Sequence, residues 1–226
     1  MNNSQCVILV PVAHRIEPDC DHGLRELEAK GYKVRRVWGY SAIDVARSEI
    51  ATSAITDGFE ELVWIDSDIS FDPLSVDHLR SHNLPIVCAI YARKAQQALA
   101  CYAMPGTAQI SFGEGGGLVE ILYGGCGFVV TRRQVYLDIQ EHERLPLCNT
   151  RTRPMVPYFQ PMVIPDDDSF WYLAEDFAFF ERARRSGYKV FADTTIRLWH
   201  IGNYGYSWEE AGSTHPRFGT YHFTLK

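Results

Sequence analysis

The first third of the chain alternates between short apolar runs and segments whose apolar residues follow helical spacing. We predict strands over residues 6–10, 32–38 and 61–66, and helices over residues 21–30 and 42–57. In the second helix, Ile43, Ala46 and Ile50 lie on one face, and Gly58 follows its end. Strands that alternate with helices through short links pair in parallel, so the chain is predicted to be an α/β protein with a mainly parallel central sheet flanked by helices.

The remainder of the chain indicates a mixed sheet. We predict strands over residues 85–91, 98–103, 108–112, 118–123, 126–131, 188–192 and 195–199, and helices over residues 74–82, 132–142 and 175–186. Residues 146–170 contain five of the 11 prolines and the acidic run Asp166–Asp168, which predicts a long irregular loop. Since no internal repeat or linker divides the sequence, we predict one domain over residues 1–226.

The clearest sign of chemistry is the segment VWIDSDIS, residues 63–70. An apolar strand carries Asp66 and Asp68 into the loop at its carboxyl end, which is where ligands bind in such sheets. Two neighbouring carboxylates repel each other unless a cation lies between them, and oxygen ligands suit Mg²⁺ or Mn²⁺. A divalent metal site is therefore predicted, with a solvated acidic turn as the alternative. A calcium loop is disfavoured because Phe71 stands where an EF-hand needs glycine.

Two later segments also carry candidate functional residues. The helix AEDFAFFERARR begins with Glu175 and Asp176, although acids at a helix start are also favoured by the helix dipole alone. In LWHIG, a strand ends at His200, whose imidazole can join carboxylates around a metal such as Mn²⁺. A single histidine is more often structural than a metal ligand.

Taken in order, these segments resemble the GT-A fold glycosyltransferases, in particular the family 2-like bacterial members. The resemblance covers residues 6–202 and includes the glycine-rich YGGCGFVVTRR at 123–133. It implies a GT-A (nucleotide-diphospho-sugar transferase) fold with a nucleotide-binding part, residues 1–95, and an acceptor-binding part, residues 96–226. It also implies transfer of a sugar from a nucleoside-diphosphate sugar to an acceptor hydroxyl, dependent on Mn²⁺ or Mg²⁺ and with inversion of configuration.

The resemblance further implies a role for individual residues. The implied metal ligands are Asp66, Asp68 and His200. The implied donor-binding residues are Pro11, Val12, Ala13, Arg47, Asp66 and Ser67. Asp176 is implied as the catalytic base with Glu175 beside it, and the implied acceptor-binding residues are Gly125 and Trp171. The acceptor itself, whether a saccharide, a lipid or a protein, stays open.

The chain departs from the family pattern at two places. Many members carry acidic residues after the second strand that bind the nucleobase, whereas this chain has WGYS at 38–41. Arg47 is followed by Ser48, where the family has asparagine. The base of the donor is therefore left open, while the expected metal site is unaffected.

Charge and hydropathy limit the other functions. A net charge of −6 argues against a general nucleic-acid binder. No apolar run approaches the roughly 18 residues of a membrane helix, and the first apolar run reads as a strand, not a signal peptide. The six cysteines are scattered without a CxxC pair, which argues against a zinc or disulfide framework. We therefore expect a cytoplasmic protein.

Two other classes of function remain open. A nucleotidyltransferase of related fold would need a glycine- and basic-rich loop after the first strand, where this chain has VPVAHRIEP. A non-catalytic nucleotide- or carbohydrate-binding module would not need Asp176. His78 and His82 lack the glutamate of an HExxH motif and predict a solvated helix face, and Cys126 predicts a buried residue and not a nucleophile.

Overall fold

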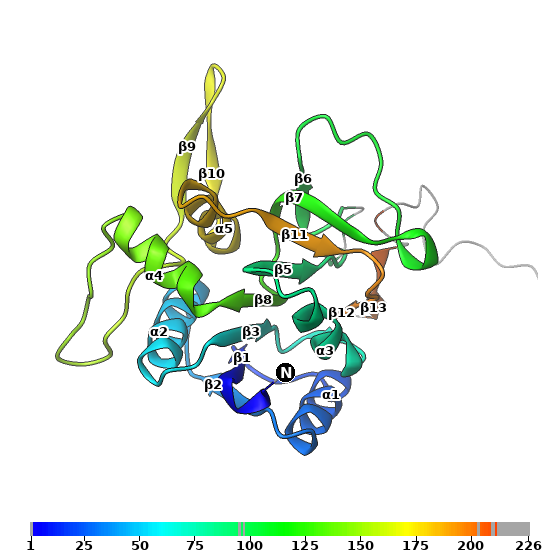
Figure 1. Cartoon of the computed structure of the whole chain (residues 1–226), viewed down its shortest axis with the longest axis horizontal. Helices are drawn as coiled ribbons and strands as arrows, with labels where there is room; N and C mark the ends of the chain where they lie inside the picture. Colours follow the sequence, from blue (N-terminus) through cyan, green and yellow to red (C-terminus); the bar gives the residue numbers. More distant parts are fainter. Residues whose placement is uncertain (1, 95, 97, 203, 209–210, 212–226) are drawn as a thin grey trace, which may run out of the picture.

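The computed structural model describes residues 2–94, 96, 98–202, 204–208 and 211, and its centre is an eight-stranded sheet (Figure 1). The strand order is β2-β1-β3-β8-β5-β11-β7-β6. The bounds are β1 (Cys6–Val12), β2 (Lys33–Trp38), β3 (Glu61–Ile65), β5 (Ile86–Ala89), β6 (Cys101–Ala103), β7 (Leu118–Gly124), β8 (Phe128–Arg132) and β11 (Val190–Asp193).

The sheet is mainly parallel, as the sequence predicts. Strand β1 pairs in parallel with β2 on one side and with β3 on the other, and β5 pairs in parallel with β11. Strand β8 lies antiparallel between β3 and β5, and β7 lies antiparallel to β11 and β6. The carboxyl ends of β1, β2 and β3 therefore meet at one edge, which is where ligand-binding loops gather in such sheets.

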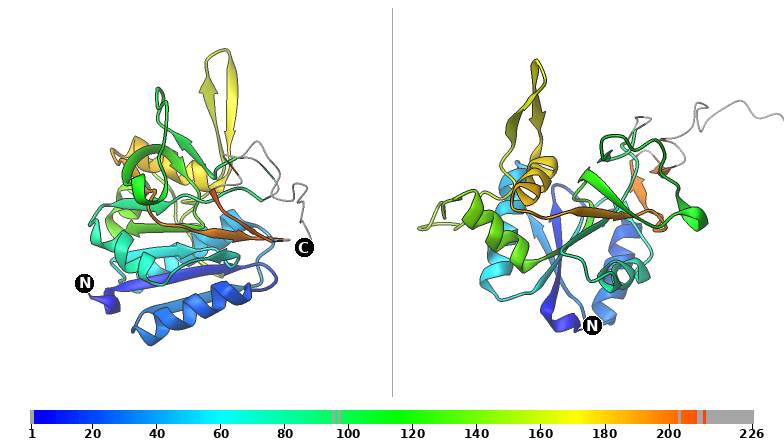
Figure 2. Two further views of the ribbon diagram at one scale, coloured as in Figure 1. Left: turned by 90° about the vertical axis from the view of Figure 1, so that its right-hand side faces the viewer. Right: turned by 45° about the horizontal axis from the view of Figure 1, so that its top comes forward.

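In the described part of the chain, five α-helices cover the two faces of this sheet (Figures 1 and 2). Their bounds are α1 (Pro18–Ala29), α2 (Ile43–Thr56), α3 (Leu74–Ser81), α4 (Arg133–His142) and α5 (Glu175–Arg185). One buried cluster joins α2, α4 and α5 to one face, and a second joins α1 and α3 to the other. Alternate residues of β1 supply both clusters, since Val7 and Leu9 point to one and Ile8 and Val10 to the other.

Two smaller sheets lie outside the central one. The first is a hairpin of β9 (Met162–Asp166) and β10 (Ser169–Leu173). The second joins β4 (Ile69–Ser70), β12 (Trp199–Ile201) and β13 (Gly205–Tyr206). The pairs Trp199–Ser70 and His200–Ile69 in this sheet bring the last part of the described chain onto the loop after β3.

The predicted irregular loop over residues 146–170 holds as far as residue 161, and the hairpin corrects its last part. Pro165 argues against a strand in sequence, but β9 pairs with β10 in a two-stranded ribbon, where the missing N–H of a proline costs little. The acidic run forms the turn, in which Asp167 takes a left-handed backbone with φ 46°. The hairpin projects from the body of the molecule in both views of Figure 2.

Two other predicted strands are also corrected. Residues 108–112 form no strand, and the turn after them contains a short 3-10 helix, Gly113–Gly115. The strand predicted over residues 195–199 begins only at Trp199, because the preceding residues turn around Asp193. No helix among the described residues is both long and apolar enough to cross a membrane.

Candidate active site

The loop after β3 is fixed by backbone hydrogen bonds on both sides. The N–H of Asp66 donates to the carbonyl of Gly127 on the β8 side at 3.0 Å, and the N–H of Ile69 donates back to the carbonyl of Asp66 at 3.0 Å. The N–H of Glu17, beyond β1, donates to the carbonyl of Ser67 at 2.8 Å. The two loops in which the resemblance places the donor therefore touch each other.

Apart from Arg47, the residues implied to bind the donor lie at the end of β1 and along these two loops. Pro11 and Val12 are buried at the end of β1, and Ala13 is exposed just beyond it. Ser67 is partly buried between the two aspartates. Ala13 and Ser67 are thus the two of these four residues that present surface to a ligand.

Asp66 is paired with a buried arginine. Arg47, on α2, is 3% exposed, and its Nη2 donates to Asp66 Oδ1 at 2.7 Å. Its Nε lies 3.8 Å from Glu175 Oε1, so one guanidinium links the loop after β3 to the start of α5. Burial alone would lower the pKa of Arg47, but Asp66 foremost, with Glu175, raises it well above its usual value. Arg47 therefore stays charged and holds both carboxylates in place.

Asp68 faces two other groups. His200 Nε2 lies 3.6 Å from Asp68 Oδ1, and Lys94 Nζ donates to Asp68 Oδ2 at 2.5 Å. Burial raises the pKa of Asp68, but the neighbouring His200 and Lys94 outweigh burial and lower the pKa to about 2. The carboxylate of Asp68 is thus ionised throughout the physiological range and lies in a cationic setting.

The position of His200 follows from the pairing of β12 with β4. In this ladder His200 lies opposite Ile69, and the N–H of Ile201 donates to the carbonyl of Asp68 at 2.7 Å. His200 Nδ1 lies 3.0 Å from the carbonyl oxygen of Ala92, where it can donate. That hydrogen bond favours the tautomer in which Nε2, the nitrogen nearest Asp68, carries the lone pair that a metal needs.

One carboxylate and one imidazole at this spacing fit a divalent metal of the Mn²⁺ class. Asp66 is arranged differently, because Arg47 takes one of its carboxylate oxygens. Over the described part of the chain, Asp66 does not join Asp68 and His200 in a compact cluster of three ligands. The structure therefore brings two of the three implied ligands together and leaves the third beside them, bound to a cation of the protein.

Asp176 lies at the first turn of α5, and its carboxyl has a raised pKa. Burial, followed by the charge of Glu175, raises its pKa from 3.8 to about 6, although the N–H of Phe177 and the charge of Arg47 lower it. The N–H of Phe177 donates to Asp176 Oδ1 at 2.8 Å. The helix start alone would lower the pKa, so burial outweighs it here.

A pocket of about 530 Å³ connects these groups. Its charged and polar walls include Lys94, Glu175, Asp176 and His200, so it joins the α5 carboxylates to the residues around Asp68. Its aromatic walls are Tyr91, Tyr102, Trp171, Tyr172 and Phe177. An apolar wall with a few convergent polar groups is typical of small-molecule sites.

The glycine-rich segment before β8 is packed and does not border that pocket directly. A Cβ on Gly125 would lie 2.3 Å from Tyr91 Oη, and one on Gly127 would lie 2.7 Å from the same atom. The N–H of Gly127 donates to Tyr91 Oη at 3.1 Å. These glycines make room for Tyr91, whose ring in turn contacts the ring of His200. Cys126 between them is buried, as predicted, and burial raises the pKa of its thiol.

Sequence reasoning missed two residues of this site, Tyr91 and Lys94. Both follow β5 in the segment YARK, which matches no motif. The one available signal is that they follow the carboxyl end of a parallel strand, where functional loops gather.

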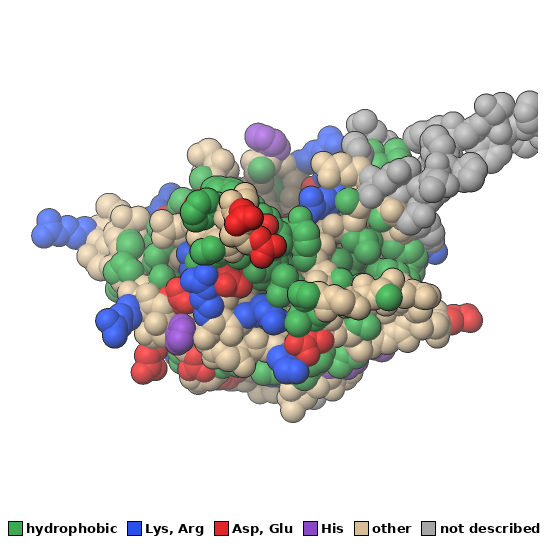
Figure 3. All heavy atoms as spheres, turned by 90° about the horizontal axis from the view of Figure 1, so that it is seen from above, with side chains coloured by type: hydrophobic (Ala, Val, Ile, Leu, Met, Phe, Trp, Pro, Cys, Tyr) green, Lys and Arg blue, Asp and Glu red, His purple; other side chains and the backbone are tan. Residues whose placement is uncertain are grey.

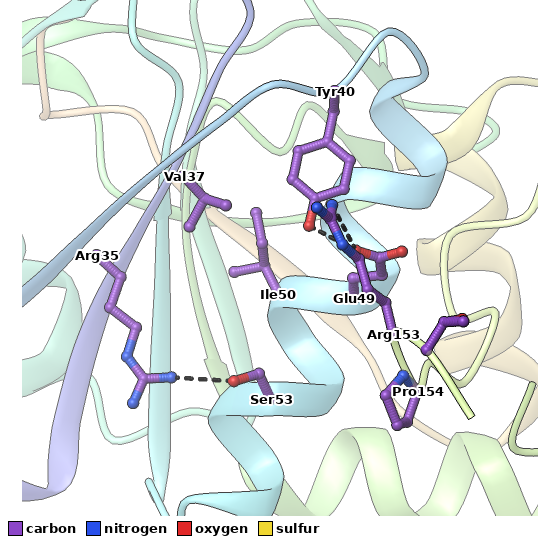
Figure 4. A pocket seen from close by; sticks show the side chains of 9 residues that line it. Arg35, Val37, Tyr40, Glu49, Ile50, Ser53, Arg153 and Pro154 are labelled. Atoms are coloured by element: carbon purple, nitrogen blue, oxygen red, sulfur yellow. Dashed lines mark hydrogen bonds and ion pairs between the residues drawn. The ribbon is translucent and has the colours of Figure 1, made fainter. Parts of the chain in front are cut away.

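A second pocket, of about 350 Å³, lies between β2 and α2 (Figure 4). Tyr40 and Glu49 are hydrogen-bonded in its wall, with Arg153 close to both. It contains none of the residues of the site described above. The pocket beside Asp68 and Asp176 is therefore chosen as the candidate site for the charged side chains that line it, and not for its size or shape.

Comparison with known proteins supports the fold. No protein-family model matches the chain, and no curated protein matches its sequence. Among solved structures, the crystal structure of A197 from STIV has a TM-score of 0.60 and 13% identity, covering 96% of this chain and 99% of that chain.

Two further solved structures are similar at a lower level. GalNAc-T7 with UDP, GalNAc and Mn²⁺ has a TM-score of 0.42 and 11% identity, covering 87% of this chain and 44% of that chain. S. aureus TarS 1-349 in complex with UDP-GlcNAc has a TM-score of 0.37 and 10% identity, covering 83% and 55%. At such identities the likeness concerns the fold alone. With its mainly parallel sheet and flanking helices, the chain has the GT-A-like fold that the sequence resemblance predicts.

Proposed function

We propose that the protein is a metal-dependent glycosyltransferase that moves a sugar from a nucleoside-diphosphate sugar to an acceptor hydroxyl. One observation supports this above the others. A single pocket borders His200, which lies beside the ionised Asp68, and also borders Asp176, a carboxyl with a raised pKa. A group that can bind a cation and a group that can take a proton thus lie on two walls of one cavity.

Asp68 and His200 are the proposed direct ligands of Mn²⁺ or Mg²⁺, and Asp66 is the third proposed ligand through its remaining oxygen. A bound metal would supply charge neutralisation for the leaving diphosphate. Lys94 lies on the other oxygen of Asp68 and can add a second positive charge beside the phosphates. The loops that carry Pro11–Ala13 and Ser67 are the proposed donor-binding walls.

Asp176 is the proposed base that takes the proton from the acceptor hydroxyl. A pKa of about 6 leaves it ionised at neutral pH and gives it more proton affinity than an ordinary aspartate, which suits general-base catalysis. Glu175 is held by Arg47 and is proposed to position Asp176 by its charge. Direct attack assisted by such a base inverts the configuration at the sugar carbon, so we propose an inverting reaction.

The aromatic part of the pocket is the proposed acceptor side. Trp171 packs edge-on against Tyr102 at 4.7 Å between ring centroids, which fixes a flat wall beside Asp176. Gly125 is proposed to act here indirectly, by admitting the ring of Tyr91. The six cysteines are unpaired, in keeping with a reaction in the reducing cytoplasm.

The test is release of nucleoside diphosphate from a panel of UDP-, GDP- and ADP-sugars, with and without Mn²⁺, using wild type and Asp68→Asn. Metal-dependent release that is lost in the variant is the expected result. Pyrophosphate release from a nucleoside triphosphate and a sugar phosphate would instead identify a nucleotidyltransferase. Tight nucleotide binding without turnover, over a range of saccharide acceptors, would identify a binding module, and either result would overturn the proposal.

A further inference from the structure

A second group of metal-ligating side chains lies outside the site described above. His78 lies on α3, His82 caps the carboxyl end of this helix four positions later, and Asp193 ends β11. His78 Nε2 lies 2.9 Å and His82 Nε2 2.7 Å from the same carboxylate oxygen, Asp193 Oδ2. The three ligand atoms all lie within 4.8 Å of one another. The predicted solvated helix face holds for His78, whose side chain is 52% exposed, but both imidazoles also contact a carboxylate that is 1% exposed.

The carboxylate of Asp193 is held in one orientation. Its Oδ1 accepts hydrogen bonds from the N–H of Thr195 at 2.9 Å and from Thr195 Oγ1 at 2.6 Å. Those bonds leave Oδ2 as the oxygen directed to the two imidazoles. Metal sites in proteins are built in this way, with a ligating carboxylate fixed by hydrogen bonds from residues that do not touch the metal.

Two imidazoles that converge on one buried oxygen are a metal-ligand arrangement as well as a hydrogen-bonded one. Without a metal, each Nε2 must carry a proton to donate to Oδ2, and a metal would replace those protons. Two imidazoles and one carboxylate are the ligand set of many zinc sites, and a separation of four residues places two histidines on the same face of a helix.

Room for a further ligand exists beside the cluster. His78 and Thr195 also line a pocket of about 330 Å³ whose walls include Arg197 and Trp199. Three protein ligands with space for a water or a small anion is the composition of an open zinc site. The cluster also stands at a useful place in the chain, because residues 194–198 lead from Asp193 directly to β12 and His200.

We propose that His78, His82 and Asp193 bind a transition-metal ion of the zinc class, at a site separate from the one beside Asp68. The ion ties α3 to the end of β11 and so fixes the start of the segment that delivers His200. The proposal is independent of the reaction catalysed, since it rests on three side chains that take no part in the proposed transfer.

The experiment is a titration of the chelator-stripped, full-length protein with Co²⁺, followed by its visible absorption, and then displacement of Co²⁺ by Zn²⁺. All proteins carry His200→Ala, so that the site beside Asp68 has lost its imidazole. The test variants are His78→Ala and His82→Ala. The matched control is His22→Ala, because His22 is an exposed histidine on α1 that pairs only with Glu26 among the described contacts.

The expected result is one tightly bound Co²⁺ with the strong absorption of four-coordinate geometry in the parent and in the His22→Ala control. Each test variant should lose at least about tenfold in affinity, the lower limit for disturbing a metal site. His82→Gln is a second variant that retains a hydrogen-bond donor but is a poor ligand, so it separates loss of metal binding from loss of the fold. Zn²⁺ should raise the thermal midpoint of the parent and not of His82→Gln.

Two results would overturn the proposal. One is a folded parent that binds no Co²⁺ or Zn²⁺ at this stoichiometry. The other is binding of equal affinity in the parent, His78→Ala and His82→Gln, which would place the metal elsewhere in the chain.

Discussion

Arg47 and Asp66 form an ion pair of 2.7 Å in which the guanidinium is almost fully buried. The first aspartate of the IDSD segment is thus neutralised by the protein, and the same guanidinium reaches toward Glu175. The side chain of Asp68, by contrast, pairs with Lys94 and His200, which line the pocket. Two aspartates that look equivalent in sequence therefore have different electrostatic partners.

Replacing Arg47 should destabilise the fold strongly. Arg47→Met leaves Asp66 and Glu175 without their shared cation, and removal of one partner from a buried ion pair costs about 3–5 kcal/mol. Arg35→Met is the control, because Arg35 pairs with Asp57 at a more exposed position, where such a pair contributes about 1 kcal/mol or less. Urea unfolding of both variants measures the difference. An equal decrease in the free energy of unfolding in both variants would mean that the buried ion pair of Arg47 stabilises the fold no more than an exposed one.

Replacing Asp176 should slow sugar transfer strongly and remove its dependence on pH near 6. Sugar transfer by wild type should rise as pH increases through about 6, where Asp176 loses its proton. Asp176→Asn should reduce transfer by at least about 100-fold, the lower end for general-base catalysis, with donor affinity close to wild type. Glu175→Gln should cost less. A variant at near wild-type rate would exclude Asp176 as the base, and loss of donor binding would assign it to the donor site instead.

The same substitution should stabilise the protein at high pH. The pKa of Asp176 is raised on folding, from 3.8 to about 6, so the folded protein binds the proton more tightly than the unfolded chain. Stability is therefore lost as pH rises through this window, and ionised Asp176 costs about 1–3 kcal/mol above it. Asp176→Asn should unfold at a higher temperature than wild type at pH 8 and gain much less at pH 4. Asp57→Asn, an exposed site, serves as the control, and a gain independent of pH would contradict the assignment.

Lys94 should compete with a metal for Asp68. Because its ammonium already contacts Asp68 Oδ2, a cation of the solution must share or displace it. The contact is partly exposed, and such pairs contribute about 0.5–1 kcal/mol, so Lys94→Met should tighten Mn²⁺ binding by about two- to fivefold in calorimetry without nucleotide. Lys189→Met, which removes the exposed contact with Glu120, should leave Mn²⁺ affinity unchanged. Weaker Mn²⁺ binding by Lys94→Met would show that Lys94 supports the metal site.

The first half of the sheet could be predicted from sequence because its signals are local. Apolar runs and helical periodicity place β1, β2 and β3, with α1 and α2 between them, to within a few residues. The hairpin β9–β10 could not, because Pro165 and the acidic turn have the composition of a loop. Its exposed positions also carry large apolar side chains, Val163, Phe170 and Tyr172, so no alternation of apolar and polar residues marks the two strands. Hydrophobic side chains of the hairpin surround acidic ones on the surface in Figure 3.

The candidate site shows the same limit. Motif order predicts Asp66, Asp68, Asp176 and His200 as site residues, whereas the contact of Lys94 with Asp68 depends on the path of one loop. The convergence of His82 on Asp193 joins residues that are 111 positions apart. Spacing along the chain gives no sign of such a contact, since it arises only once β11 has been inserted beside β5.

The pairing of β12 with β4 also determines when, during folding, the proposed metal site can be assembled. During synthesis, the chain presents Asp66 and Asp68 long before it presents His200, and contacts between such distant segments form slowly. A nascent or truncated chain that ends before residue 199 carries the carboxylates without their imidazole and without the ladder that fixes Asp68. Binding of a metal at the proposed site would therefore report that β12 has paired with β4, and we expect a chain without β12 to bind the proposed donor poorly.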